Sequence, residues 1–592
     1  MLGFVFAGGL LMVLFFVGIA SLISSAKSEF STENKEVTVK QNSIYHLKFK
    51  GQIEERGTKD PFEGLDLGPI SSMGKMSLRD IVESINYAAT DDHIKGIFME
   101  VSGFPGGMAQ MEEVRNTLEN FKKSGKWIVA YSEGYDQRGY YLVSAADKVY
   151  MYPLGNLEFK GLSANLMYIK GLLEKLDVEV QAIKGPNNIY KSAVEPFTAD
   201  KMSDANKLQI NTYLNSIWSH WLAGISKERG VSIDKLNMYA DSLSIKNAQK
   251  SVDLGLIDDL LYKDEVLAKL MDRVDVSSED DLDFVLFSKY KNKNKKSPTK
   301  SKGASRADTK KIAVIYANGE IRSGTNSDGI MGSISIAKAI KKARMDTNVK
   351  AIVLRVNSPG GSALASDVMW RETVLAKAEK PFIVSMGDLA ASGGYFISCN
   401  ADKIYANETT ITGSIGVFGL LPVTEKFFQN KLGIIFQRAE TNKHASFANG
   451  VSKLDEKEYS VINESIINIY DDFITKVSEG RNLSKDQVNE IARGRVWTGN
   501  DALEIGLVDE IGDLNDAIAY AAKEADLDGY RLYELPIQKD PFEELFGNFQ
   551  AKISSEFLKQ NMGASYKYLQ IFEDVKKMEG VQARLPYTIE IQ

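Results

Sequence analysis

The chain contains two copies of one sequence unit, about 255 residues apart. The run IKGIFMEVSGFPGG at 94–107 matches VKAIVLRVNSPGG at 349–361. Two further pairs follow in the same order, RGYYLVSAADKVY with GGYFISCNADKIY and LGLIDDL with IGLVDEI. Because the matching elements keep their order and approximate spacing, we expect two related folding units in tandem.

Each copy alternates short runs rich in Val and Ile with longer amphipathic stretches. This alternation predicts an α/β class, with βαβ crossovers around a largely parallel sheet. Residues 288–311 between the copies are basic, polar and nearly free of apolar side chains, which predicts a flexible linker. Alternatively, its lysines contact anionic lipid or nucleic acid. We expect repeat domains at 38–287 and 312–535, followed by an extension at 536–592.

The first segment has no charged side chain before Lys27. As a helix, residues 1–25 could span about 30 Å of hydrocarbon. A cleaved signal peptide is the competing interpretation, because Ser24, Ser25 and Ala26 are small. The apolar run is long for a signal peptide, and no basic region precedes it. We therefore expect an uncleaved transmembrane helix at 1–25.

Composition excludes several classes of function. A net charge of -7 argues against a nucleic-acid partner. The single cysteine, Cys399, excludes an internal disulfide and any metal site built from several cysteines. The four histidines are scattered and form no H-E-x-x-H motif. We expect no metal and no cofactor.

The second copy contains a candidate nucleophile, Ser392, in GDLAASGGYF. Glycines at a strand-to-helix turn let backbone amides approach a substrate carbonyl, so we expect Gly393 and the Gly360–Gly361 turn of NSPGGS to form an oxyanion hole. Alternatively, both elements are only tight structural turns. The first copy has Gln137 in place of Ser392, which favours chemistry in the second copy alone.

A serine nucleophile needs a base, and no histidine lies in a recognisable triad motif. A lysine serves if desolvation lowers its pKa. Lys191 lies among apolar and small residues in IYKSAVEPF, although an ordinary surface lysine is the alternative. Lys443 in ETNKHASF is a second candidate, but its polar neighbours would keep its pKa near about 10.4.

Five elements, in order from about residue 40 to 530, resemble the long, double-domain form of the signal peptide peptidase A (protease IV) family: YKSAVEPF, NSPGGS, GDLAASGGYF, TGSIGVFG and RVWTGNDALEIGLVDEIGDL. The resemblance implies Ser392 as nucleophile, Lys191 as base and Ser414 as a support for the lysine. It also implies a crotonase-like, Clp-protease-like fold for each repeat and a homo-oligomer, a tetramer, with an enclosed interior. The Lys-rich linker is unusual for the family, and residues 540–592 match nothing in it.

The resemblance thus implies a membrane-bound serine endopeptidase that degrades signal peptides left in the membrane. We expect extended apolar peptides as substrates, bound by strand addition. The expected location is the bacterial inner membrane, as a single-pass protein whose catalytic part faces the periplasm. Two rivals are a crotonase-type acyl-CoA enzyme and a catalytically dead membrane scaffold. Ser392 together with Lys191 argues against both, because neither rival needs a serine nucleophile.

Overall fold

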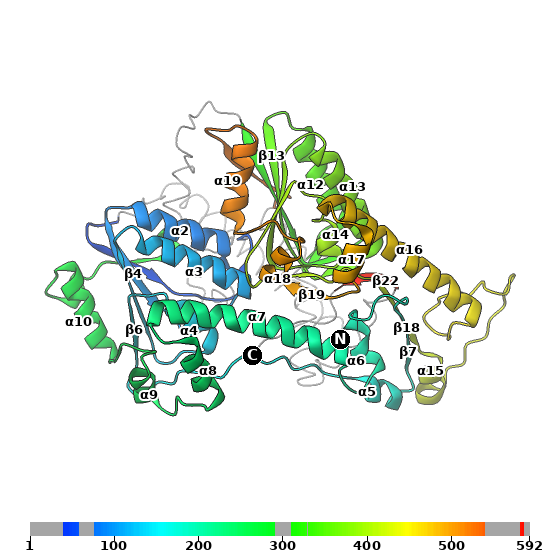
Figure 1. Cartoon of the computed structure of the whole chain (residues 1–592), viewed down its shortest axis with the longest axis horizontal. Coiled ribbons are helices and arrows are strands. Elements are labelled where there is room, and N and C mark those ends of the chain that lie inside the picture. The colour runs from blue at the N-terminus through cyan, green and yellow to red at the C-terminus, as the bar shows by residue number, and fades with distance from the viewer. Residues whose placement is uncertain (1–38, 58–75, 291–309, 328, 539–579, 585–592) are drawn as a thin grey trace, which may run out of the picture.

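The computed structural model describes residues 39–57, 76–290, 310–327, 329–538 and 580–584 (Figure 1). The expected membrane helix at 1–25 lies outside the described residues, as do most of the linker and most of the C-terminal extension. None of the helices in the described ranges combines the length and the apolar character needed to cross a bilayer.

The first repeat contains a parallel six-stranded sheet of order β8-β6-β5-β4-β1-β9. Helices cover this sheet, so its central strands are apolar along their length and almost fully buried. The strands are β1 (Ser43–Leu47), β4 (Ile94–Glu100), β5 (Trp127–Ser132), β6 (Lys148–Met151), β8 (Asp259–Leu260) and β9 (Phe284–Leu286). The connecting helices are α2 (Leu78–Thr90), α3 (Met108–Lys122) and α4 (Gln137–Val143).

The second repeat contains an eight-stranded sheet of order β19-β17-β15-β13-β10-β21, with β16 and β20 attached beside β15. All its pairings are parallel except β17 with β19. Its strands are β10 (Lys311–Asn318), β13 (Val349–Ser358), β15 (Phe382–Ala391), β16 (Lys403–Ala406), β17 (Ile411–Gly413), β19 (Val496–Thr498), β20 (Glu510–Ile511) and β21 (Arg531–Leu535). Its helices include α12 (Ser333–Met345), α13 (Ala363–Lys377), α14 (Gly393–Phe396) and α19 (Leu514–Glu524). One parallel and one largely parallel sheet confirm the predicted α/β class with βαβ crossovers.

A third sheet, of order β12-β11-β14-β22-β18-β7, joins the repeats. Strand β7 (Glu179–Ile183) of the first repeat pairs antiparallel with β18 (Phe418–Val423) of the second. Strand β22 (Gly580–Arg584), near the end of the chain, lies between β18 and β14 (Gly360–Ser362). At the other end of the sheet, β11 (Glu320–Arg322) pairs with β14, and β12 (Ile330–Gly332) is the edge strand. The first repeat therefore extends an arm onto the second, as Figure 1 shows for β7 beside β18.

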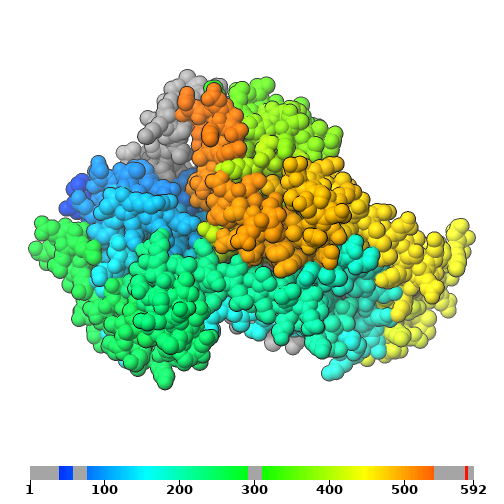
Figure 2. All heavy atoms as spheres, viewed as in Figure 1, coloured from blue at the N-terminus to red at the C-terminus, as the bar shows by residue number. Residues whose placement is uncertain are grey.

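Helix α7 (Asp204–Arg229) returns the chain from this arm to the first sheet and runs beneath the second repeat in the view of Figure 1. Ser203 caps its N-terminus, and Gly230, with a φ of 68°, ends it. In Figure 2 the two repeats form one continuous body. The remaining elements are β2 (Ile53–Glu54), β3 (Met76–Ser77), α5 (Lys170–Lys175), η2 (Ser192–Val194), α6 (Glu195–Thr198), α8 (Ile233–Asp241), α9 (Ala248–Asp253), α10 (Lys263–Val274), η3 (Glu279–Asp281), α15 (Glu425–Leu432), α16 (Glu456–Arg481), α17 (Lys485–Ile491) and α18 (Gly499–Glu504).

A buried ionic cluster fixes the contact between the two repeats. Arg355 on β13 is fully buried, and its guanidinium donates to Glu55 at 2.7 Å and to Glu113 at 2.5 Å. Both carboxylates belong to the first repeat. Asp388 on β15 accepts from the backbone N–H of Ala109, in the first turn of α3, at 2.9 Å. The sequences of both repeats are therefore needed to satisfy these buried charges.

Replacing Arg355 by Ala should destabilise the folded chain by about 3–5 kcal/mol, because two buried carboxylates lose their cation. Urea unfolding followed by circular dichroism measures this change. Arg371→Ala is the control: Arg371 is exposed, and its loss should change stability by no more than about 0.5 kcal/mol. Equal effects of the two substitutions would show that the cluster does not hold the repeats together.

Candidate active site

Ser392 occupies the turn between strand β15 and the short helix α14. Its φ of 54° and ψ of -112° are strained for a residue with a Cβ. The backbone N–H of Ser392 donates to Gly413 O at 2.8 Å, which anchors the turn to β17. The side chain is fully buried. Strain of this kind is typical of functional sites, where the surrounding structure holds a side chain in one orientation.

Lys191 approaches Ser392 from the first repeat. Its Nζ lies 2.8 Å from Ser392 Oγ, 2.9 Å from Ser414 Oγ and 2.9 Å from the Ser414 carbonyl oxygen. All three side chains are inaccessible to solvent. Ser414 follows β17, and Lys191 precedes η2 at the end of the arm. The structure thus brings the three predicted residues together from two repeats.

Burial lowers the pKa of Lys191 well below its ordinary value, because no carboxylate offsets the cost of desolvating its charge. A neutral amine has two N–H donors and one lone pair. The three oxygen atoms around Lys191 Nζ match these groups. The two Ser414 oxygens can accept its two N–H groups, and the Ser392 hydroxyl can donate its proton to the lone pair. The arrangement suits a lysine that removes a proton from Ser392.

The Lys191 loop is held by both repeats. The backbone N–H of Tyr190 donates to Arg493 O at 3.0 Å, and Asn188 Oδ1 accepts from Val417 N at 3.1 Å. Gly494 has a φ of 79°, and a Cβ there would lie 2.7 Å from Lys191 Cβ. Asn188 and Gly494 were not anticipated. Their only sequence signals are an Asn three residues before the lysine and a Gly immediately before the RVWTG element, and neither indicates a partner.

The glycines predicted to form an oxyanion hole lie beside the nucleophile. Gly360 has a φ of 93°, and a Cβ on it would lie 2.7 Å from Gly393 N. Gly361 pairs with Ile321 of β11, so β14 is fixed within the third sheet. The Gly360 N–H itself donates to Ser358 Oγ at 3.2 Å. Only glycine permits this close approach of two backbone segments.

The comparisons with known proteins agree with this chemistry. The sequence matches peptidase family S49 over residues 120–277 and 375–528. Protease 4 of Haemophilus influenzae is 35% identical over 453 residues, which cover 75% of this chain and 72% of that protein. The chain belongs to peptidase family S49. The chloroplastic serine protease SPPA of Arabidopsis thaliana is 31% identical over 92% of this chain and 78% of its own length.

Among solved structures, a ClpP1 mutant of Listeria monocytogenes is 19% identical, covers 36% of this chain and 95% of its own, and has a TM-score of 0.24. The sequence relatives confirm the predicted serine peptidase of the protease IV type. They count against the two rivals, the acyl-CoA enzyme and the inactive scaffold. The catalytic roles of individual residues rest on the geometry above.

The position equivalent to Ser392 has a different role in the first repeat of this S49 peptidase. Gln137 begins α4, and its Oε1 accepts from the backbone N–H groups of Lys160 and Gly161 at 2.8 and 3.0 Å. Its carboxamide therefore fixes a loop and offers no nucleophile. Lys443, the alternative base, is exposed in the loop between α15 and α16, in contrast to the buried Lys191.

Ser414→Ala should reduce kcat/KM about tenfold and leave the enzyme active. The substitution removes one hydroxyl contact to Lys191 Nζ but keeps the carbonyl contact. A single hydrogen bond contributes roughly 1 kcal/mol, close to the free energy of a tenfold change in rate. Steady-state hydrolysis of a peptide substrate measures the effect. A loss as large as that of Ser392→Ala would make Ser414 indispensable instead.

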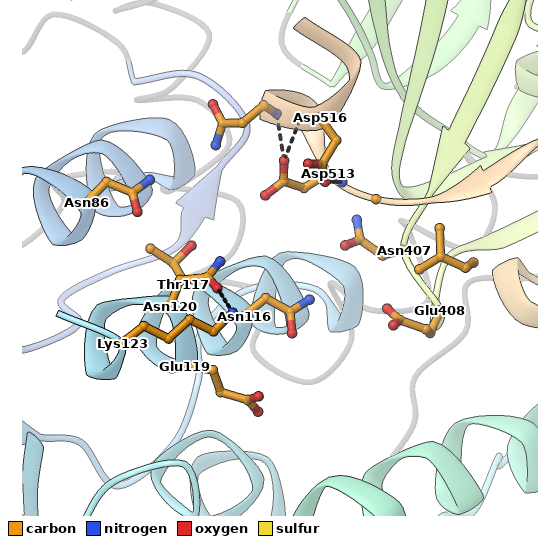
Figure 3. A pocket seen from close by; sticks show the side chains of 13 residues that line it. Asn86, Asn116, Thr117, Glu119, Asn120, Lys123, Asn407, Glu408, Asp513 and Asp516 are labelled. Atoms are coloured by element: carbon orange, nitrogen blue, oxygen red, sulfur yellow. Dashed lines mark hydrogen bonds between the residues drawn. The ribbon is translucent and has the colours of Figure 1, made fainter. Parts of the chain in front are cut away.

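A polar pocket of about 430 Å³ opens between the repeats, away from Ser392 and Lys191 (Figure 3). Its walls come from α2 and α3 of the first repeat and from the segments around Asn407 and Asp513 of the second. Its lining is mainly amide and carboxylate groups. The lining is polar and includes neither Ser392 nor Lys191, so we assign the pocket no part in the reaction.

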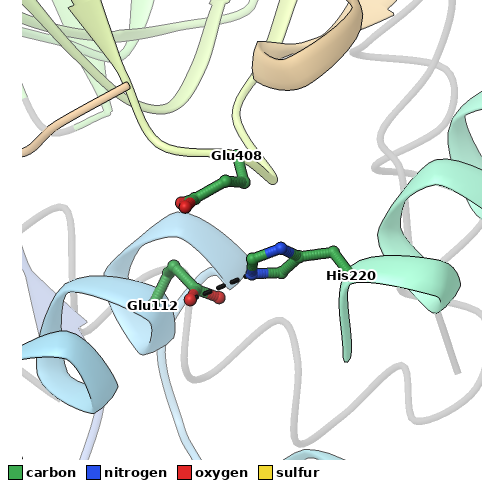
Figure 4. Close-up of side chains that lie close together, drawn as sticks. All are labelled: Glu112, His220 and Glu408. Atoms are coloured by element: carbon green, nitrogen blue, oxygen red, sulfur yellow. Dashed lines mark ion pairs between the residues drawn. The ribbon is translucent and has the colours of Figure 1, made fainter. Parts of the chain in front are cut away.

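Two groups of described side chains have the composition of a metal site; one of them, His444 with Asp455 and Glu458, lies on the partly exposed surface around the start of α16. In the other, Glu112 on α3, His220 on α7 and Glu408 after β16 face one another (Figure 4). His220 Nε2 lies 3.0 Å from Glu112, and Tyr141 also donates to Glu112. Burial opposes charge on His220, but the hydrogen bond and the charge of Glu112 raise the pKa of His220. The geometry is that of an ion pair between elements, and we retain no metal in the mechanism.

Proposed function

We propose that the chain is a serine endopeptidase whose nucleophile and base come from different repeats. The observation that carries the proposal is the 2.8 Å approach of Lys191 Nζ to Ser392 Oγ within a fully buried cluster. The second repeat supplies the nucleophile and the first supplies the base. Neither repeat is expected to hydrolyse peptides alone.

The reaction is acyl transfer. Neutral Lys191 takes the proton of Ser392, whose Oγ attacks the peptide carbonyl and forms a tetrahedral intermediate. The N–H of Gly393 is the proposed donor to the developing oxyanion. The Gly360–Gly361 turn lies beside it, with the Gly360 N–H itself donating to Ser358 Oγ. Protonated Lys191 then gives its proton to the leaving amine. Water, activated by the same lysine, hydrolyses the acyl-enzyme and regenerates Ser392.

We infer that the substrates are extended apolar peptides, in particular signal peptides left in the membrane. Strand β14 lies beside the nucleophile, and both β14 and β18 pair through their backbone with a strand between them, which is the kind of pairing a peptide substrate in strand conformation would use. A relative from Enterococcus faecium, 36% identical over 226 residues, is named a putative signal peptide peptidase SppA, which fits this substrate class. The apolar segment 1–25 would anchor the enzyme in the bacterial inner membrane, next to such substrates.

Hydrolysis of synthetic peptides tests the assignment. The purified full chain, in detergent micelles, is given a quenched fluorescent signal peptide and a polar peptide of equal length. We expect a kcat/KM at least about tenfold higher for the apolar peptide, and no hydrolysis by Ser392→Ala. Equal hydrolysis of both peptides would contradict the proposed substrate class. Activity retained by Ser392→Ala would contradict the assignment of Ser392 as the nucleophile.

We further propose that the catalytic part lies in the periplasm. We also propose that the chain forms a homo-oligomer, which is a tetramer by family resemblance. Several large apolar side chains are exposed on α15 and the loop after it, which project from the body in Figures 1 and 2: Leu432, Ile434, Ile435, Phe436 and Phe447. A second copy would cover them. Light scattering of the full chain in detergent tests the assembly, and a monomer would contradict it.

The periplasmic location is tested by adding protease to spheroplasts. Complete resistance of the repeats to digestion would contradict this location.

A further inference from the structure

Gln209 is a fully buried side chain of helix α7 that contacts both repeats. Its Nε2 lies 3.1 Å from the carbonyl oxygen of Tyr190 and 2.9 Å from Ser192 Oγ, the residues on either side of Lys191. Its Oε1 accepts from the backbone N–H of Val496, in strand β19 of the second repeat, at 3.3 Å. One carboxamide therefore joins the loop that carries the base to a strand of the other repeat.

Strand β19 leads directly to the nucleophile. Val496 pairs with Gly413 of β17, and the Gly413 carbonyl oxygen accepts from the backbone N–H of Ser392 at 2.8 Å. Ser414, the next residue, places its hydroxyl and its carbonyl oxygen against the base. The acceptor side of the Gln209 carboxamide is thus joined, through two paired strands, to both serines of the site.

A second layer of hydrogen bonds fixes the orientation of the carboxamide. Gln209 Nε2 also lies 3.0 Å from Asn206 Oδ1, and Ser192 Oγ donates to the same oxygen at 2.9 Å. Asn206 Nδ2 in turn donates to Glu195 Oε2 at 3.0 Å. The reverse orientation of the carboxamide would turn Nε2 towards the N–H of Val496, donor against donor. Because each polar group of this buried network has a partner, the network is rigid.

Lys191 depends on such support, because a neutral amine forms weaker hydrogen bonds than an ammonium ion paired with a carboxylate. Among the described residues, its Nζ contacts oxygen atoms of Ser392 and Ser414 and no carboxylate. The backbone of the Lys191 loop must therefore set the position of Nζ. A misplacement of about 1 Å between reacting groups can reduce a rate by about a hundredfold.

We propose that Gln209 is a positioning residue for the base, an inference that rests on the proposed function of Lys191. Its carboxamide holds the Tyr190 carbonyl and the Ser192 hydroxyl at a fixed distance from β19, so that Lys191 Nζ stays within 2.8 Å of Ser392 Oγ. The partners of Gln209 include neither Nζ nor this Oγ, so it acts through the loop.

Gln209→Met tests the proposal, because methionine keeps the length of the side chain and removes its N–H groups and its oxygen. Complete labelling with a fluorophosphonate probe counts the intact sites, and peptide hydrolysis is then expressed per labelled chain. We expect kcat per site to fall at least about tenfold, with KM within about twofold of wild type. A purely structural role would lower only the labelled fraction, and wild-type kcat per site would overturn the proposal.

Ser216→Ala is the matched control. Ser216 lies on the same helix, and its Oγ is 2.9 Å from Thr498 Oγ1 of the same strand, β19. The substitution removes a hydrogen bond between α7 and β19 but leaves the Lys191 loop untouched, so kcat per site should stay within about twofold of wild type. A fall as large as that of Gln209→Met would overturn the proposal, since any contact between this helix and this strand would then have the same effect.

Ser192→Ala decides the question if Gln209→Met does not fold. It removes only the hydroxyl beside the base that Gln209 contacts, and kcat per site should fall about threefold with KM unchanged. Wild-type kcat per site in Ser192→Ala would overturn the proposal. Lys191→Ala, measured alongside, separates the two claims. Activity in Lys191→Ala would contradict the proposed function, whereas an inactive Lys191→Ala beside fully active Gln209→Met would contradict only the positioning role.

Discussion

Replacing Lys191 by Ala is expected to reduce kcat/KM by about three orders of magnitude or more, and replacing Lys443 by Ala to leave most activity. Lys191 Nζ lies 2.8 Å from Ser392 Oγ, so its removal leaves the hydroxyl without a base. General-base catalysis accelerates a reaction about 10²–10⁴-fold. In a catalytic pair, the loss of either residue alone removes most of the rate acceleration that the pair provides. Lys443 is exposed, and its substitution alters only a surface loop.

Both lysine variants are compared at matched protein concentration, after circular dichroism and light scattering have established normal folding and assembly. Peptide hydrolysis is the readout. If Lys443→Ala were inactive and Lys191→Ala active, the base would have to be reassigned to Lys443. The division of the catalytic pair between the repeats would then be wrong.

Acidification should also inactivate the enzyme reversibly. The buried Lys191 has a lowered pKa, so it is neutral above that pKa and becomes protonated as the pH falls through it. Only the neutral amine accepts the Ser392 proton, so kcat/KM falls towards acidic pH. The same shift affects stability. Between the lowered pKa and about 10.4, the unfolded chain binds more protons than the folded one, so this group's contribution to stability rises with pH.

The second large effect is expected for Ser392→Ala, which should abolish peptide hydrolysis with folding retained. The side chain is fully buried, and its loss removes one hydroxyl and little packing. Loss of a triad-type nucleophile costs several orders of magnitude in kcat. Thermal unfolding and peptide hydrolysis are measured on the same preparation. Residual activity above about a tenth of wild type would indicate a different nucleophile.

The sequence was sufficient to predict the two α/β repeats and the three residues that meet in the site. The repeats were detectable because matching strands and turns recur in the same order. Ser392 and Lys191 were candidates because glycine turns and an apolar setting are local in sequence, and the family resemblance then implied their roles as nucleophile and base. The family resemblance supplied the role expected for Ser414.

The third sheet could not be predicted, because β7, β18 and β22 carry no sequence signal for their partners. Strand pairing between segments hundreds of residues apart depends on the tertiary placement of both repeats. The buried Arg355 cluster was missed for the same reason, since its carboxylates, Glu55 and Glu113, lie in the other repeat. The sequence showed that Gln137 replaces the serine of the second repeat. Its hydrogen bonds to the loop at Lys160 and Gly161 became visible only in the structure.

The central claim is that Lys191 of the first repeat activates Ser392 of the second. Labelling of the full chain with a fluorophosphonate probe, followed by peptide mapping and rate measurement, tests it most directly. We predict a single adduct on Ser392, no adduct in Ser392→Ala, and labelling of Lys191→Ala slowed at least about a hundredfold, with Lys443→Ala labelled at the wild-type rate. Labelling of another serine, or of Lys191→Ala at the wild-type rate, would contradict the claim.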